Sequence, residues 1–174
     1  MKENVSLNKQ MALTNGSIIG IALIFYSLLL WVLDVDRENW LQYFSYLIML
    51  VGVILAVKQY REKNNGYLTY NQAFSNGFLT LFIAGILSAV YVVIFFQLIA
   101  PGEVDKMIEM AEEKMYESNP ELTEEQVKVA MSYAKMFMTP WAMAIMVLIF
   151  NTLASLLIGA IVAAFMKKEK ELFN

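Results

Sequence analysis

Four long apolar runs constrain this chain more than any other feature of its sequence. They cover residues 12–33, 40–57, 74–100 and 141–166. The hydrocarbon core of a bilayer is about 30 Å thick, so a helix needs about 20 mainly apolar residues to cross it. Each run is close to that length or longer, and a single segment in lipid must pair its own backbone groups as a helix. The sequence therefore predicts an all-α integral membrane protein with four transmembrane helices.

The connections between these runs differ greatly in length. Residues 34–39 are too few for anything but a tight turn, so the first two helices are predicted to be antiparallel neighbours. Residues 58–73 form a polar loop before the third run. Residues 101–140 separate the third run from the fourth and are the only polar segment of any size. We therefore treat residues 1–174 as a single membrane domain with an insertion at 101–140.

The insertion carries two amphipathic patterns. In its first half the apolar residues recur at helical spacing, namely Val104, Met107, Ile108, Ala111 and Met115. Pro120 interrupts the pattern, and Thr123 with Gln126 has the spacing of a capping box that starts a second helix. The apolar face of that helix is predicted to contain Val127, Ala130, Met131, Ala134 and Phe137. The result is an amphipathic helical hairpin whose two stripes either cover each other or dock a partner.

Lysine and arginine are unevenly distributed between the two sides of the four runs. The side holding both termini and the 58–73 loop has eight of them against four acids, about +4, and the other side has five against twelve, about −7. Short loops rich in Lys and Arg stay cytoplasmic, and Trp31, Trp40 and Trp141 fall at the opposite edge as an interfacial belt. The predicted location is the bacterial inner (cytoplasmic) membrane, with N- and C-termini cytoplasmic and the hairpin extracytoplasmic.

Composition excludes most familiar catalytic chemistry. The chain has no Cys and no His, so it lacks thiolate nucleophiles, imidazole bases and the usual zinc, haem and iron–sulfur ligands. The four runs contain no Asp, Glu, Lys or Arg, which coupled transport normally requires. We expect no catalytic residue, metal or cofactor and no nucleic-acid partner. Methionine pairs in the insertion have a spacing compatible with Cu(I), but packing explains them more simply.

A few polar and small residues remain as candidates for a role inside the membrane. Asn151 lies near the middle of the fourth run and is expected to hydrogen-bond a neighbouring helix, with a conduction role as the alternative. Small residues at four-residue spacing, Gly16 with Gly20 and Ser155 with Gly159, allow helices to approach closely within the bundle or in a dimer. Similar tripeptides at residues 14–16 and 75–77 open the first and third runs and suggest an internal repeat.

The loop before the third run is the most motif-like segment. Its basic and aromatic residues form a possible membrane-surface loop: Lys58, Tyr60, Arg61, Lys63 and Tyr67. They could contact anionic lipid or a cytoplasmic partner. The simpler interpretation is an orientation signal and membrane-edge anchor.

Residues 58–77, KQYREKNNGYLTYNQAFSNG, resemble the bacterial four-helix membrane family catalogued as domain of unknown function 4199. The likeness extends over nearly the whole chain: the first pair of runs, the K-Q-Y-R-[DE]-K-N-x-G-Y loop, the A-F-x-x-G start of the third run, an acidic outer segment and a lysine tail. The resemblance implies the same topology. It implies no functional residues, because the family has no assigned activity.

Two classes of function fit these observations. The first is a non-enzymatic association or scaffold protein, bound to the lipid bilayer and forming a homo-oligomer or binding a membrane-protein partner through the 103–138 hairpin. The alternative is a small oligomeric transporter or channel, since four uncharged helices offer little pore lining alone. An enzyme acting on lipid through Asp34, Asp36 and Glu38 is a distant third, because acids in a tight turn are usually only solvated.

Overall fold

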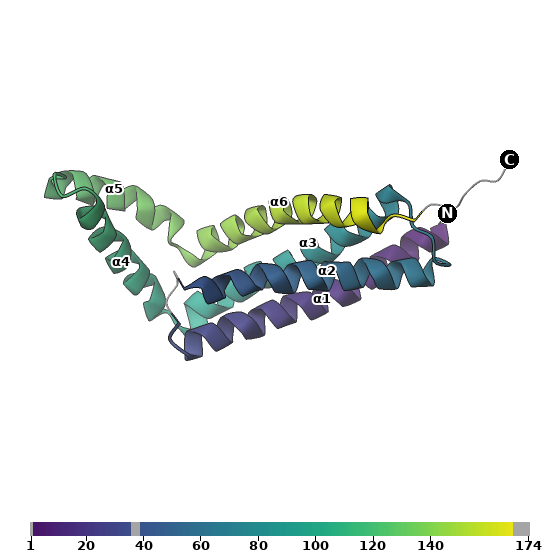
Figure 1. Ribbon diagram of the computed structural model, residues 1–174. Helices are drawn as coiled ribbons and strands as arrows, with labels where there is room; N and C mark the ends of the chain where they lie inside the picture. Colours follow the sequence, from purple (N-terminus) through teal and green to yellow (C-terminus); the bar gives the residue numbers. More distant parts are fainter. Residues whose placement is uncertain (1, 36–38, 169–174) are drawn as a thin grey trace. The chain divides into compact units, whose positions relative to one another are not determined.

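The computed structural model describes residues 2–35 and 39–168, with side chains from Ser6 onward. The charges expected at Lys2, at 36–38 and at 169–171 lie outside the described side chains. The described residues form helices and one isolated β-bridge: α1 (Lys2–Val32), η1 (Trp40–Tyr43), α2 (Phe44–Lys63), α3 (Tyr70–Ile94), η2 (Phe95–Ile99), α4 (Gly102–Ser118), α5 (Glu124–Phe137) and α6 (Pro140–Met166) (Figure 1). Four segments are long and apolar enough to cross a membrane: Ser6–Val32, Trp40–Lys63, Tyr70–Ile99 and Pro140–Met166. The prediction of an all-helical chain with four such helices is confirmed.

Three helices extend beyond the apolar runs that predicted them. Helix α1 begins at Lys2 rather than residue 12, α2 ends at Lys63 rather than residue 57, and α3 begins at Tyr70 rather than residue 74. With 31 residues, α1 is about 46 Å long, or about 16 Å more than a hydrocarbon core requires. The prediction that residues 58–63 belong to a loop is wrong, because hydropathy marks where a helix stops being apolar and not where it stops being helical.

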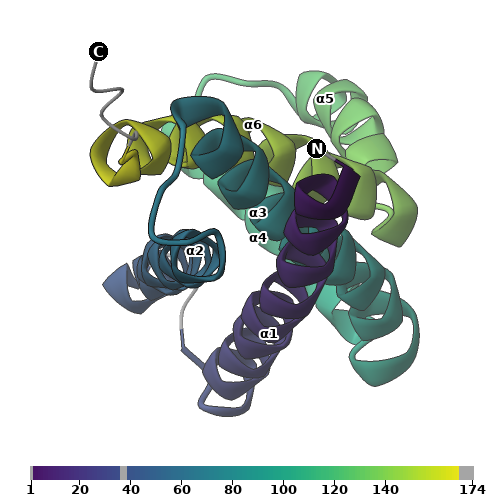
Figure 2. The same ribbon diagram turned by 90° about the vertical axis from the view of Figure 1, so that its right-hand side faces the viewer.

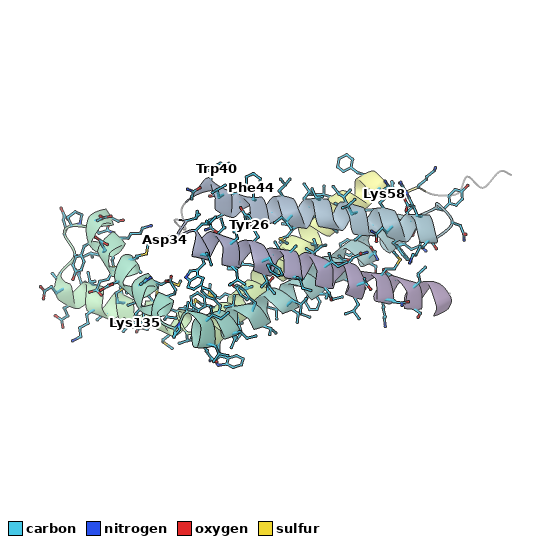
Figure 3. All side chains as sticks on the ribbon, turned by 90° about the horizontal axis from the view of Figure 1, so that it is seen from below. Tyr26, Asp34, Trp40, Phe44, Lys58 and Lys135 are labelled. Carbon is cyan, nitrogen blue, oxygen red and sulfur yellow. The ribbon has the colours of Figure 1, made fainter. Side chains whose placement is uncertain are left out.

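The chain divides into two compact units, Met1–Ser88 with Ile149–Asn174 and, between them, Ala89–Leu148. In the first unit α1 and α2 contact each other as antiparallel neighbours, which confirms the tight connection expected between them. The Tyr26 hydroxyl donates a 2.6 Å hydrogen bond to the carbonyl of Leu41 across this pair. Figure 3 shows Tyr26, Asp34 and Trp40 near one end of the pair and Lys58 toward the other.

The end of α1 is a capped turn. Asp34 has a left-handed backbone (φ 51°). The amide of Asp34 donates to the carbonyl of Trp31 at 3.1 Å, and the amide of Val35 donates to the carbonyl of Leu30 at 3.0 Å. This pair of bonds is a Schellman motif, which satisfies carbonyls that the helix leaves unpaired. It turns the chain toward η1 and α2 within a few residues.

Glycines set the closest approaches between helices in the first unit. A Cβ built on Gly16 of α1 would lie 2.5 Å from the Thr80 carbonyl oxygen of α3, and Gly20 meets the same helix one turn later. A Cβ on Gly77 of α3 would lie 3.5 Å from the Cα of Gly159 in α6. The small residues are therefore used within the bundle, α1 against α3 and α3 against α6.

The apolar core of the first unit lies among α1, α2, α3 and α6. Its buried members are Met11, Met49, Val53, Val57, Tyr60, Leu68, Ala73, Leu81, Val162 and Ala163. Many other apolar side chains of α1, α2 and α6 are exposed, as expected for helices that face lipid.

The second unit contains the predicted hairpin. The π-helix η2 ends with the Ala100 amide donating to the Phe95 carbonyl at 2.8 Å, and Pro101 directly precedes α4. Helices α4 and α5 contact each other, and the capping box of Thr123 with Gln126 is present. The helical hairpin and its capping box are thus confirmed.

The apolar face predicted for α5 is only partly correct. Val127 and Met131 are buried, whereas Phe137 is 61% exposed. Phe137 follows Met131 by six residues, so at 100° per residue it points well away from that side of the helix. It belongs instead to a second apolar stripe on α5.

Candidate functional site

Polar side chains from the parts of α1, α2 and α3 that extend beyond the apolar runs lie at one end of the first unit. We call it the polar end: residues 6–16 of α1, 58–63 of α2, 64–69, 70–80 of α3 and 166–168. Figure 2 views this end, with the start of α1, the turn from α2 to α3 and the end of α6 in the foreground. Two features hold it together. Leu68 and Lys168 exchange two 2.8 Å backbone hydrogen bonds, and the Arg61 guanidinium donates a 3.5 Å bond to the carbonyl of Met166.

The turn from α2 to α3 is compact because its residues suit left-handed backbone. Asn65 (φ 58°) and Gly66 (φ 80°) both adopt it. The Asn64 side chain donates to the carbonyl of Tyr67 at 2.8 Å, and the Gly66 amide donates to the carbonyl of Arg61 at 2.9 Å. These bonds fix the six-residue connection against the end of α2.

A second capping box starts α3. The Thr69 amide donates to Gln72 Oε1 at 3.0 Å, and the Gln72 amide donates to Thr69 Oγ1 at 3.3 Å. Leu68, which precedes the cap, is 1% exposed and belongs to the core. The cap explains why α3 begins four residues before its apolar run.

The five residues predicted as a membrane-surface loop do not act as one surface. Tyr60 is 1% exposed and lies in the core, so its assignment to the surface is wrong. Tyr60 lies on the core-facing side of α2, which continues to Lys63 instead of ending near residue 57 as predicted. Arg61 is half-buried against the end of α6, whereas Lys58, Lys63 and Tyr67 are exposed. The structure therefore leaves two lysines and one tyrosine of the set available at the surface.

A buried polar cluster joins α1 to α3 at the polar end. The Asn76 amide donates a 2.8 Å hydrogen bond to Asn8 Oδ1, and the Asn8 amide donates a 3.0 Å bond to Ser75 Oγ. Asn76 and Thr80 are fully buried. Among the described residues, Asn76 Oδ1 and Thr80 Oγ1 have no hydrogen-bond partner. A buried polar atom without a partner destabilises a fold by about 1–3 kcal/mol.

The sequence analysis missed this cluster, although a signal for it exists. Asn76 and Thr80 are four residues apart in an otherwise apolar run and therefore share one helix face. The partner Asn8 precedes the first apolar run and could be found only from the fold. The Asn-Gly pairs at 15–16 and 76–77 also differ in environment, since Asn15 is half-buried and Asn76 fully buried.

Asn151 lies beside α3 as its position in the fourth run suggested. A Cβ built on Gly85 would lie 2.8 Å from Asn151 Cβ, so this side chain packs against a glycine of the neighbouring helix. The Ser155 hydroxyl donates to the Asn151 carbonyl at 2.6 Å, and Ser155 is fully buried. An interhelical hydrogen bond from the Asn151 side chain stays a prediction.

An open groove lies between α1 and α2 at the polar end. Its volume is about 140 Å³, and its lining is Leu7, Gln10, Met11, Thr14, Asn15, Gln59 and Lys63. Residues at four-residue spacing supply each wall, Gln10 with Thr14 on α1 and Gln59 with Lys63 on α2. The Thr14 hydroxyl donates to the Gln10 carbonyl at 3.1 Å. One cation and several neutral amides therefore line a space that is open to one side.

The chemistry available at this end is binding chemistry. Amides and an ammonium group donate hydrogen bonds. Among the described residues, no group of three or more His, Cys, Asp or Glu side chains could hold a metal ion. The polar end is suited to holding a small polar or anionic group.

The chain belongs to the family described as "Protein of unknown function (DUF4199)", whose model matches residues 14–168. The resemblance seen in residues 58–77 is thereby confirmed over most of the chain. A comparison with curated proteins and one with solved structures found no match. The family description names no activity, so function must be argued from the surfaces of this chain.

Proposed function

We propose that this family member is a multi-pass protein of the bacterial inner membrane that acts by association with another protein chain rather than by catalysis. The proposal places both termini and the polar end in the cytoplasm and the α4–α5 hairpin outside. Supporting this orientation, Lys58, Lys63, Lys167 and Lys168 are exposed at the polar end, whereas acids dominate the hairpin.

A second apolar stripe on α5 carries the proposal. It consists of Val129, Tyr133, Met136 and Phe137, which are 55%, 65%, 66% and 61% exposed. These residues follow helical spacing and lie on the face of α5 opposite to the buried Val127 and Met131. The stripe is therefore additional to the one that α4 covers. Aromatic residues and methionine are enriched in the contact regions of protein interfaces.

Other exposed residues of the hairpin also suit a protein partner. Helix α4 exposes Met110 (45%) and Tyr116 (39%). Acidic residues occupy the first turns of both helices: Glu103 and Asp105 in α4, Glu124 and Glu125 in α5. Specific interfaces usually combine apolar anchors, which supply most of the affinity, with charges, which raise selectivity.

The test compares two double variants of the same helix in the full-length chain. Tyr133→Ser with Met136→Ser removes the stripe, and Lys128→Ser with Lys135→Ser changes two exposed residues outside it. Tagged proteins are purified in mild detergent, co-purifying chains are quantified by mass spectrometry, and the mass of each complex is measured by light scattering. We expect a stoichiometric partner, either a second copy or another membrane protein, to be lost only from the stripe variant.

A wild-type protein that is monomeric and free of partners in mild detergent overturns the proposal. Loss of the partner from both variants overturns the role given to the stripe. In either case the transporter or channel hypothesis gains weight, and proteoliposome flux of ions and small solutes becomes the decisive measurement.

A further inference from the structure

The groove between α1 and α2 differs from the rest of the surface in its chemistry. Its polar lining offers four nitrogen-bearing side chains as donors: Gln10, Asn15, Gln59 and Lys63. Among the described residues, none of those lining the groove is acidic. Because α1 and α2 are antiparallel, their helix dipoles oppose each other, and the charge preference rests on Lys63. A single ammonium group among neutral donors favours an anion with several oxygen acceptors.

The size of the groove fits a phosphate group better than a lone ion. About 140 Å³ is many times the ~15 Å³ that a single water needs. Leu7 and the buried Met11 form an apolar part of the lining, which leaves the donors on the walls. Such a site can surround a tetrahedral group while the remainder of the ligand leaves through the open side.

An apolar ridge leads away from the groove along α2. Lys63 and Gln59 line the groove, and every fourth residue that follows toward the other end of the helix is apolar and exposed: Leu55 (51%), Val51 (48%) and Leu47 (50%). Helix α1 continues in the same way from Thr14 to Ile18 (60%). The groove lies where the candidate spans Ser6–Val32 and Trp40–Lys63 reach their polar ends, which is headgroup level in a bilayer. A polar site that opens onto an apolar ridge matches an amphiphile.

We propose that this groove binds the phosphate of an anionic phospholipid, with Lys63 as the charge partner, Gln10, Asn15 and Gln59 as hydrogen-bond donors, and an acyl chain along the ridge of α2. The phosphate chemistry alone would also admit inorganic phosphate, so the experiment separates the two sources. The site does not depend on the hairpin and stands whether or not the hairpin binds a partner.

Lys58 provides a matched control for Lys63. Both are exposed lysines on α2, but they are five residues apart, so they point about 140° away from each other around the helix. Only Lys63 lines the groove. Lys63→Gln and Lys58→Gln remove the same charge, and each is tested in the full-length protein in a neutral maltoside detergent. Far-UV circular dichroism and the elution profile establish that each variant is folded.

Native mass spectrometry then measures binding of dioleoyl phosphatidylglycerol, with phosphatidylcholine and millimolar inorganic phosphate as separate arms. We expect wild type to bind one phosphatidylglycerol per chain with saturation. Lys63→Gln should bind it at least tenfold more weakly, which corresponds to about 1.4 kcal/mol. Lys58→Gln should weaken binding less than threefold. Leu55→Ala is expected to weaken lipid binding without affecting any phosphate binding.

Equal loss in the two lysine variants overturns the proposal, because it reports general surface charge. Undiminished binding to Lys63→Gln overturns it as well. A third outcome overturns the lipid as the occupant of the groove. In it, inorganic phosphate binds wild type and not Lys63→Gln, whereas phosphatidylglycerol binding does not saturate.

Discussion

Replacing Gly16 by alanine tests a close contact between α1 and α3 in the first unit. Gly16 lies in α1 against α3, and a Cβ at this position would meet the Thr80 carbonyl oxygen at 2.5 Å and Ile83 Cβ at 2.8 Å. Ordinary contact begins at 3.4 Å. Since the obstructing atoms are a backbone oxygen and a branched Cβ, no rotamer change relieves the clash, and the two helices must move apart.

The size of the effect follows from two opposing terms. Overpacking a well-packed site costs about 1–3 kcal/mol, and the rigid obstruction here favours the upper half of that range. Alanine in place of glycine within a helix stabilises it by about 0.5–1 kcal/mol. The free energy of unfolding of Gly16→Ala is therefore expected to fall by about 1–2.5 kcal/mol relative to wild type.

The control is Gly102→Ala in α4, where a Cβ meets nothing within 4 Å and the backbone is ordinary. It should leave stability unchanged or raise it by up to about 1 kcal/mol. Unfolding by SDS titration in mixed micelles, followed by circular dichroism, gives both values. Ile83→Ala should not rescue Gly16→Ala, because the Thr80 carbonyl remains. Stability of Gly16→Ala equal to that of Gly102→Ala would refute the close approach of α1 and α3.

Two further comparisons use the same unfolding assay. Asn8→Leu should lower the free energy of unfolding by about 1–3 kcal/mol, because it leaves the Asn76 amide buried without its acceptor. Thr80→Val should leave that free energy unchanged or raise it, because it removes a hydroxyl that has no partner among the described residues. A destabilising Thr80→Val would indicate that a bound water satisfies the hydroxyl. Gly52→Ala should destabilise through contact with Ile19 Cγ1 at 2.6 Å, and Ile19→Ala should offset part of the loss; additive effects of the two changes would contradict this contact.

The sequence predicted the number and approximate positions of the spanning helices because hydropathy responds directly to the solvent a segment meets. It placed the ends less well. Helix α3 begins at a capping box of Thr69 and Gln72, the same Leu-Thr-x-x-Gln pattern that correctly located the start of α5 at Thr123. The same pattern thus starts both helices, but at Thr69 it lies among the apolar and aromatic residues that lead into a membrane span, where a cap is harder to recognise.

The candidate site could not be predicted in the same way because it depends on contacts between distant segments. Asn8 and Asn76 are 68 residues apart, and the hydrogen bond between them joins two different helices. Tyr60 looks like an interfacial aromatic in the sequence, yet the continuation of α2 turns it into the core. Periodicity identifies which face of a helix is apolar, but it does not identify which helix will cover that face.

The distribution of charge along the chain limits where this protein can bind a ligand through a charged side chain. The four apolar runs contain no Asp, Glu, Lys or Arg, so all of these side chains lie outside the runs. At the polar end, α1 and α2 continue beyond their apolar runs and form the two walls of the groove. Gln59, Lys63 and Gln10 therefore lie on helices, at fixed spacing, instead of on a loop. A loop could offer the same side chains, but it would lose more conformational entropy on binding. The extra turns of α1 and α2 are therefore the structural reason to expect a specific site there rather than general attraction to a charged surface.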